Sequence, residues 1–190
     1  MPEYIVIIIC IYILALTGIL KRPCASMGIT LIKTCYVLIC VLALSIFQLR
    51  IGMEISINLA SLVLLFMPGM LTKKTDADSA GIGAIMLISA VAALLKHSGE
   101  FYGADSGLLC GLMAGMSAFI YADNPSAAAY AAGSIPLITA AMNDVITLIV
   151  SGYASIEIGH DTVAAQLTAL CISVVIICIR NLLPKQAETE

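Results

Sequence analysis

The chain has 190 residues, of which 61% are hydrophobic and only 11% charged. Soluble domains carry about 25% charged residues, so there is too little charge here to cover a soluble surface. We therefore expect lipid to be the main solvent and residues 1–190 to form a single integral membrane domain. The net charge of −3, without any basic cluster, argues against nucleic acid as a partner.

Seven apolar runs follow one another along the chain and predict membrane-spanning helices, each of which needs about 20 apolar residues to cross a bilayer. Short polar or Pro-Gly segments separate these runs. The fold class expected is all-α, a polytopic transmembrane helix bundle of about seven spans. The runs are residues 4–20, 27–49, 55–71, 81–95, 107–121, 126–150 and 162–183.

The distribution of basic residues predicts the orientation of these spans, because cytoplasmic loops are enriched in Lys and Arg. With seven spans, the side that holds the C-terminus receives seven basic residues and the other side receives two. This places the N-terminus outside and the C-terminus in the cytoplasm of a cell that carries the protein in its cytoplasmic (inner) membrane. The first group is Lys21, Arg22, Lys33, Lys73, Lys74, Arg180 and Lys185; the second is Arg50 and Lys96.

Four glycines recur at every fourth position, at Gly103, Gly107, Gly111 and Gly115. This spacing places them along one helical face, where another helix backbone can approach closely, as in GxxxG packing. The partner helix can belong to the same chain, to a second copy in a homo-oligomer, or to another membrane subunit. The pattern does not choose between these three.

The run 126–150 contains Gly133, Ser134 and Pro136 near its middle. Proline removes one backbone donor and crowds the preceding turn. Carbonyls freed in a bilayer are tolerated only against protein or a water-filled cavity. We therefore expect either a broken helix that lines a binding site or a simple proline kink.

Asp144 is the carboxylate placed deepest in an apolar run, and an ionisable residue within the membrane is a functional-site hypothesis by default. Thr139 and Asn143 lie within about a turn of it. Together with Gly133 and Pro136 these residues form the expected transport or ion-binding site. The alternative is a carboxylate that is hydrogen-bonded to a neighbouring helix for packing.

A second polar pair, Glu54 and Asn58, has i, i+4 spacing at the start of the run 55–71. The stretch Gly52-Met-Glu54-Ile-Ser-Ile-Asn58 resembles the G-x-E-x-x-x-N helix of the K-type subunits of complex I and the related antiporter C-type subunits. The resemblance implies that Glu54 lies on a proton path. It covers the eleven residues from Gly52 to Leu62, and this chain is about twice as long as members of that family. Glu54 can instead be an ordinary acid at a helix start.

Another local stretch, Phe101-Tyr102-Gly103 followed by Gly107-Leu-Leu-Cys-Gly111, is similar to the proton-gated urea channel and amide transporter family. That family also has short multi-span chains, and the resemblance implies a small-solute channel.

Catalytic and metal-binding signatures are absent from the sequence. There is no HExxH or GxSxG motif, and the seven cysteines include no CxxC pair. We expect no enzyme activity, no metal and no cofactor. The function expected is ion or small-solute permeation, with or without coupling to protons. The alternative is a non-catalytic subunit of a larger membrane complex.

Overall fold

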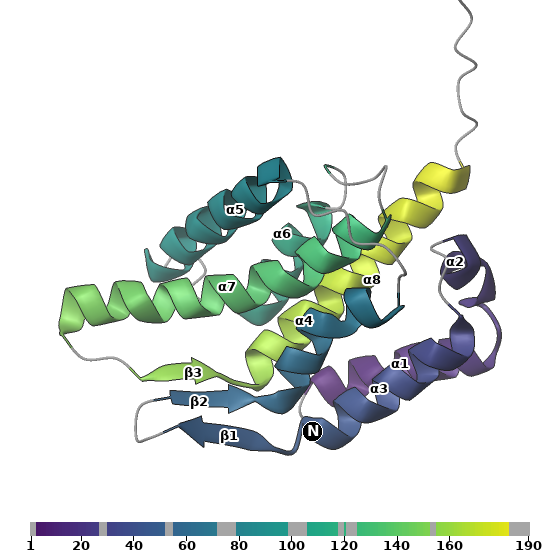
Figure 1. The fold of residues 1–190 in the computed structure, drawn as a ribbon, viewed down its shortest axis with the longest axis horizontal. Coiled ribbons are helices and arrows are strands. Elements are labelled where there is room, and N and C mark those ends of the chain that lie inside the picture. The colour runs from purple at the N-terminus through teal and green to yellow at the C-terminus, as the bar shows by residue number, and fades with distance from the viewer. Residues whose placement is uncertain are drawn as a thin grey trace, which may run out of the picture.

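The computed structural model describes residues 3–26, 30–51, 55–71, 79–98, 106–117, 120, 125–152 and 155–182. This part of the chain is mostly helical, which confirms the expected helical class, and it also contains three short strands that were not expected (Figure 1). The elements in order are α1 (Glu3–Leu16), α2 (Lys21–Ser26), α3 (Leu31–Leu44), β1 (Gln48–Ile51), β2 (Ile55–Asn58), α4 (Leu59–Leu71), α5 (Ser79–His97), α6 (Ser106–Met116), α7 (Pro125–Ser151), β3 (Ile156–Ile158) and α8 (His160–Leu182).

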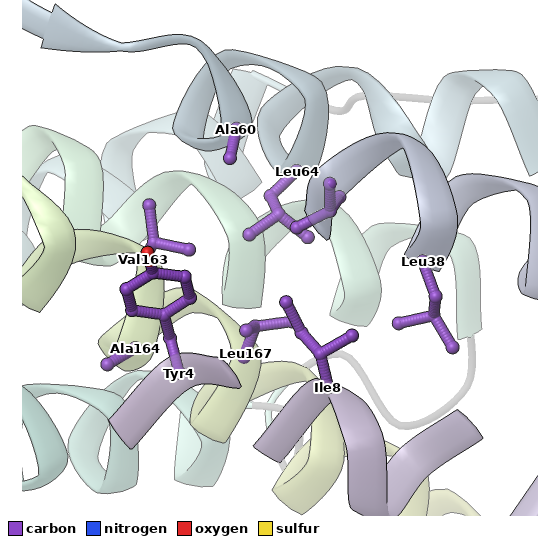
Figure 2. Close-up of a cluster of buried hydrophobic side chains, with 9 residues drawn as sticks. Tyr4, Ile8, Leu38, Ala60, Leu64, Val163, Ala164 and Leu167 are labelled. Carbon is purple, nitrogen blue, oxygen red and sulfur yellow. The ribbon is translucent and has the colours of Figure 1, made fainter. Parts of the chain in front are cut away.

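Helix α8 crosses the middle of the bundle and packs against α1, α4, α6 and α7, while α5 packs on α7 (Figure 1). The buried apolar side chains where α1, α3, α4 and α8 meet come from segments far apart in the sequence. Figure 2 shows this cluster, in which Tyr4 and Ile8 of α1 face Leu64 of α4 and Leu167 of α8. The cluster fixes the N-terminal helix against the C-terminal one.

The three strands form one sheet at the end of the bundle where α3 ends and α8 begins (Figure 1). Strands β1 and β2 pair in antiparallel fashion, and β2 pairs in parallel with β3, with Ile55 opposite Ile156. The expectation of a helix from residue 55 is therefore wrong for residues 55–58, and residues 48–49 are likewise strand. The alternation Ile-Ser-Ile at residues 55–57 suits a strand with one apolar face. The average hydropathy of such a short segment does not distinguish a strand from a helix.

Helix α7 is continuous from Pro125 to Ser151 and passes through Pro136 without a break. The expectation of a broken helix is therefore wrong. In the turn before the proline, the hydroxyl of Ser134 donates to the main-chain oxygen of Tyr130 over 2.7 Å. Such a back-bond to the preceding turn keeps the hydroxyl satisfied inside an apolar helix.

Two helices in the described part of the chain are long and apolar enough to cross a membrane, over Ala127–Ser151 and His160–Arg180. Shorter apolar helices cover Tyr4–Leu16, Leu31–Leu44 and Gly83–His97. Many large aliphatic side chains on the outer faces are exposed, among them Ile13, Ile32, Leu87 and Ile149. Soluble monomers rarely expose apolar surface so widely.

Candidate functional site

The fully buried side chain of Gln166 joins three helices in the interior of the bundle. From α8, its Nε2 donates to the main-chain oxygen of Gly133 on α7 over 2.7 Å and to that of Ser61 on α4 over 3.2 Å. Both amide hydrogens are therefore used on carbonyls of two other helices. We refer to Ser61, Gly133 and Gln166 as the polar junction.

Two features of α7 explain why the junction forms there. A Cβ atom on Gly133 would lie only 2.9 Å from the main-chain oxygen of Leu64, so the glycine allows α4 and α7 to approach closely. Pro136 has no N–H to give to the main-chain oxygen of Ala132, four residues earlier. The side-chain donor of Gln166 reaches the carbonyl of the next residue, Gly133.

Two oxygen atoms of the junction remain without a hydrogen-bond partner among the described residues, Oε1 of Gln166 and Oγ of Ser61. Both residues are fully buried. Nearly all buried polar atoms in folded proteins form hydrogen bonds with protein or ordered water, so two unpaired oxygen atoms within one junction are unusual. Amide and hydroxyl oxygens of this kind can accept from a polar solute or water, or coordinate a hard cation.

Asp144 lies away from this junction, towards the end of α7 that faces the sheet. Its Oδ2 accepts a hydrogen bond from the main-chain N–H of Glu157 in β3 over 3.1 Å. The side chain of Asn143 lies beside it, and Lys96 of α5 is the nearest basic group that acts on it. The carboxylate therefore attaches β3 to the helix and is only half-buried.

Thr139 is buried on a different side of α7, next to the thiol of Cys110 on α6. Five residues of α-helix turn the chain by about 140°, so Thr139 and Asp144 do not share a face. The expected cluster of Thr139, Asn143 and Asp144 is thus divided in the structure, and only Asn143 lies with the carboxylate.

Asn58 lies at the end of β2, and the expectation that it sits on a helix is wrong. Its Oδ1 accepts from the N–H of Ala60 over 2.9 Å and so caps α4. Its Nδ2 donates to the main-chain oxygen of Ser45 over 2.9 Å and lies 3.3 Å from Nδ1 of His160. The ring of His160 stacks on Tyr4, with centroids 5.0 Å apart. Asn58 therefore joins α3, α4 and α8, whereas its expected partner Glu54 lies outside the described residues.

The glycine face of α6 packs against α8 of the same chain. A Cβ on Gly111 would lie 2.7 Å from the main-chain oxygen of Ala165, and one on Gly115 would lie 2.6 Å from Cβ of Ile172. Of the three partners that the spacing allowed, these two glycines contact the internal one. Gly107 belongs to the first turn of α6, and Gly103 lies outside the described residues.

Gln166 and Ser61 were not among the predicted site residues. Both are polar residues within apolar runs, and that pattern is the signal in the sequence that could have identified them. All seven cysteines are free thiols, and no group of three or more His, Cys, Asp or Glu among the described residues could hold a metal ion.

Comparison with protein families, with curated proteins and with solved structures finds no match to this chain. Function has to be inferred from the residues of the chain alone.

Proposed function

We propose that this protein is a seven-span membrane protein that allows an ion or a small polar solute to cross the bilayer, with or without coupling to protons. The spans are α1, α3, α4, α5, α6, α7 and α8, and α2 connects the first two of them. The widely exposed aliphatic side chains of these helices support a lipid environment. The short helices of the set would span the core with help from their flanking residues.

The arrangement of the ends supports an odd number of spans. The beginning of α1 and the beginning of α8 lie at the sheet end, where Tyr4 stacks on His160. At the opposite end, α2 packs against α8, and Cys24 lies near Cys178. The exposed residue Lys21 and the terminal-turn Arg180 belong to this second end. By the positive-inside rule the second end is cytoplasmic and the sheet faces outward.

The polar junction is the observation that carries the permeation proposal. Gln166 presents an unpaired amide oxygen, and Ser61 an unpaired hydroxyl, where α4, α7 and α8 meet in the bundle interior. Polar residues inside membrane proteins face the bundle interior and mark substrate or ion pathways. The permeating species would exchange hydrogen bonds or coordination with these oxygens during passage.

Asp144 provides the ionisable group of the proposed pathway, at the outer end of α7. Its Oδ2 is held by the N–H of Glu157, and the carboxylate remains partly exposed. A carboxylate in this position attracts cations and can exchange protons with the outer solution. We assign it the first binding step on the outer side, with Gln166 and Ser61 deeper along the route.

The alternative function is that of a non-catalytic subunit in a larger membrane complex. The exposed aliphatic faces of the helices would suit other membrane subunits as well as lipid. The glycine face of α6 does not favour this alternative, because Gly111 and Gly115 contact α8 of the same chain.

Flux measurements on the purified protein in lipid vesicles test the proposal. Proton, sodium, potassium and small neutral amide fluxes would be compared for the wild type, Gln166→Leu and Asp144→Asn. Thr168→Val is the matched control on α8, because it removes a buried hydroxyl that has no partner among the described residues. We expect flux of one solute class above that of empty vesicles, its loss in both site variants, and its retention in the control.

Wild-type flux in both site variants would contradict the assigned pathway. Absence of flux from the wild type, together with stoichiometric co-purification of other membrane polypeptides under gentle detergent extraction, would favour the subunit alternative.

A further inference from the structure

The three-stranded sheet has one polar and one apolar face. Side chains directly opposite one another on paired strands share a face, and successive residues alternate between faces. Because Arg50 pairs with Ser56, and Ser56 with Glu157, these three residues lie on one face. The residues between them are all aliphatic. The apolar face consists of Leu49 and Ile51 of β1, Ile55 and Ile57 of β2, and Ile156 and Ile158 of β3.

The β1 part of this apolar face is uncovered in the described part of the chain, whereas the β2 and β3 parts are half-buried or, at Ile158, buried. All four residues of β1 are exposed, with Leu49 at 44% and Ile51 at 54% of their full accessible surface. Just before β1, Ile46 is 79% exposed and Phe47 is 59% exposed. Both residues follow directly on α3, whose own exposed aliphatic residues include Ile39 and Leu42.

The sheet is held firmly in this position. Asp144 accepts from the N–H of Glu157 and fixes β3 to α7, while Asn58 fixes the end of β2 to the loop after α3. Strand β1 lies at one edge of the sheet, and the side that faces away from β2 is unpaired among the described residues. Unpaired backbone groups cannot lie in the hydrocarbon core, but the polar interface of a bilayer satisfies them.

We propose that the exposed β1 part of this apolar face, with Leu49 and Ile51, binds the outer leaflet of the bilayer at the level of the lipid headgroups, with phospholipid as its occupant. Arg50, Ser56 and Glu157 on the opposite face then point to water. The sheet acts as an interfacial anchor, because its exposed apolar side chains contact lipid while its polar side chains stay in water. Phe47 at the start of β1 contributes an aromatic ring at the same level.

Two observations favour lipid over a second copy of the chain. The exposed apolar face is continuous along the chain with that of α3, so one lipid surface can cover both. In addition, a stable protein–protein interface buries roughly 800 Å² on each partner, and two half-exposed side chains on a single edge strand provide much less.

The absence of tryptophan from the chain makes a direct test available, because every introduced Trp reports without background. Ile51→Trp places the fluorophore on the apolar face, and the adjacent Arg50→Trp is its matched control on the polar face. Leu87→Trp, on the exposed face of α5, reports on the proposed spans themselves. Each full-length variant would be reconstituted in phosphatidylcholine vesicles with brominated acyl chains, and its quenching by bromine and by aqueous iodide would be compared.

We expect bromine to quench Ile51→Trp and Leu87→Trp, and iodide to quench Arg50→Trp. Iodide quenching of both sheet variants, or protection of Ile51→Trp from both quenchers, would overturn the anchor proposal. The second of these results would indicate a protein partner on that face. Since the inference rests on the proposed spans, absence of bromine quenching in Leu87→Trp would overturn those spans instead. Leu49→Trp replaces Ile51→Trp if the latter fails to fold.

Discussion

Nε2 of Gln166 on α8 lies 2.7 Å from the main-chain oxygen of Gly133 on α7, and the same nitrogen donates to the main-chain oxygen of Ser61 on α4. One side chain thus connects three helices at a place where two helix backbones nearly touch. Gln166→Leu keeps most of the volume but leaves both carbonyls without this donor. Both carbonyls lie inside continuous helices, so the change removes one extra hydrogen bond from each, worth about 0.5–1.5 kcal/mol, with the lower end typical of membrane proteins. We expect a lower melting temperature in detergent.

Thr168→Val is the control for this measurement, because the hydroxyl that it removes has no partner among the described residues. We expect the melting temperature of Thr168→Val to equal or exceed that of the wild type. Equal melting temperatures for the wild type and Gln166→Leu would show that the three-helix bridge does not stabilise the folded state.

The contact between α6 and α8 predicts the effect of Gly111→Ala. The added Cβ would lie 2.7 Å from the main-chain oxygen of Ala165 and 2.8 Å from Cβ of Thr168, so the two helices must separate. Overpacking of this kind typically costs about 1–3 kcal/mol. We expect thermal destabilisation in detergent with no change in particle mass, because the glycine contacts the same chain.

Gly83→Ala is the matched control, since no atom lies within 4 Å of the added Cβ and the residue is in α5. Alanine in place of an unconstrained helical glycine stabilises by about 0.5–1 kcal/mol. A change of particle mass in Gly111→Ala without a loss of thermal stability would mean that this face contacts another chain instead.

The approximate positions of the longer helices could be predicted from hydropathy, because each apolar run contains one helix in the described part of the chain, although two runs also include strand residues and α2 lies between runs. The sheet could not, for a physical reason. Strand β3 has only three residues, and its parallel partner β2 lies about a hundred residues earlier, so neither strand shows a pattern until the fold brings them together. The same long-range pairing determines where Asn58 and Asp144 find their partners.

The candidate site was predicted only in part. Gly133 is part of the polar junction, but the donor to its main-chain oxygen, Gln166, comes from a helix about thirty residues away. Sequence spacing shows which residues of one helix share a face, and it cannot show which neighbouring helix supplies a donor. The carboxylate of Asp144 was recognised by its chemistry, while its contact with β3 required the sheet.

Asn58→Ala is expected to destabilise the sheet end of the bundle. It removes the oxygen that caps α4 at Ala60 and the donor that reaches Ser45. Loss of a helix cap costs about 1 kcal/mol, and the unpaired carbonyl of Ser45 adds to that. Asn58→Ser is the control, because a serine hydroxyl can still cap the helix. We expect the melting temperature of Asn58→Ser to lie between those of the wild type and Asn58→Ala; equal losses in the two variants would show that the cap is unimportant.

Cys24 in α2 predicts a pH dependence of stability outside the proposed spans. Burial raises the pKa of its thiol, and the hydrogen bond with Thr34 offsets part of this effect. The folded state therefore keeps the proton at a pH where the unfolded chain loses it. The resulting stability is fully present below the unfolded pKa, about 8.5, and is lost as the pH rises through the folded pKa.

Cys24→Ser removes this ionisation and tests the effect. We expect the melting temperature of the wild type, relative to that of Cys24→Ser at the same pH, to fall as the pH is raised from 7 to 10. A difference that is constant over this range would show that the thiol does not change its pKa on folding.

The orientation of the bundle can be tested at two exposed basic residues that lie at its opposite ends, Lys21 of α2 and Arg50 of β1. In a variant with all seven natural cysteines replaced, Lys21→Cys and Arg50→Cys would each carry a single thiol. The excess of basic residues at the α2 end predicts that this end is cytoplasmic. We expect a membrane-impermeant maleimide to label Arg50→Cys in intact cells and Lys21→Cys only after permeabilisation. The opposite pattern would reverse the orientation. Labelling of both variants in intact cells would mean that α3 does not cross the membrane, because α3 is the proposed span that separates these two positions along the chain.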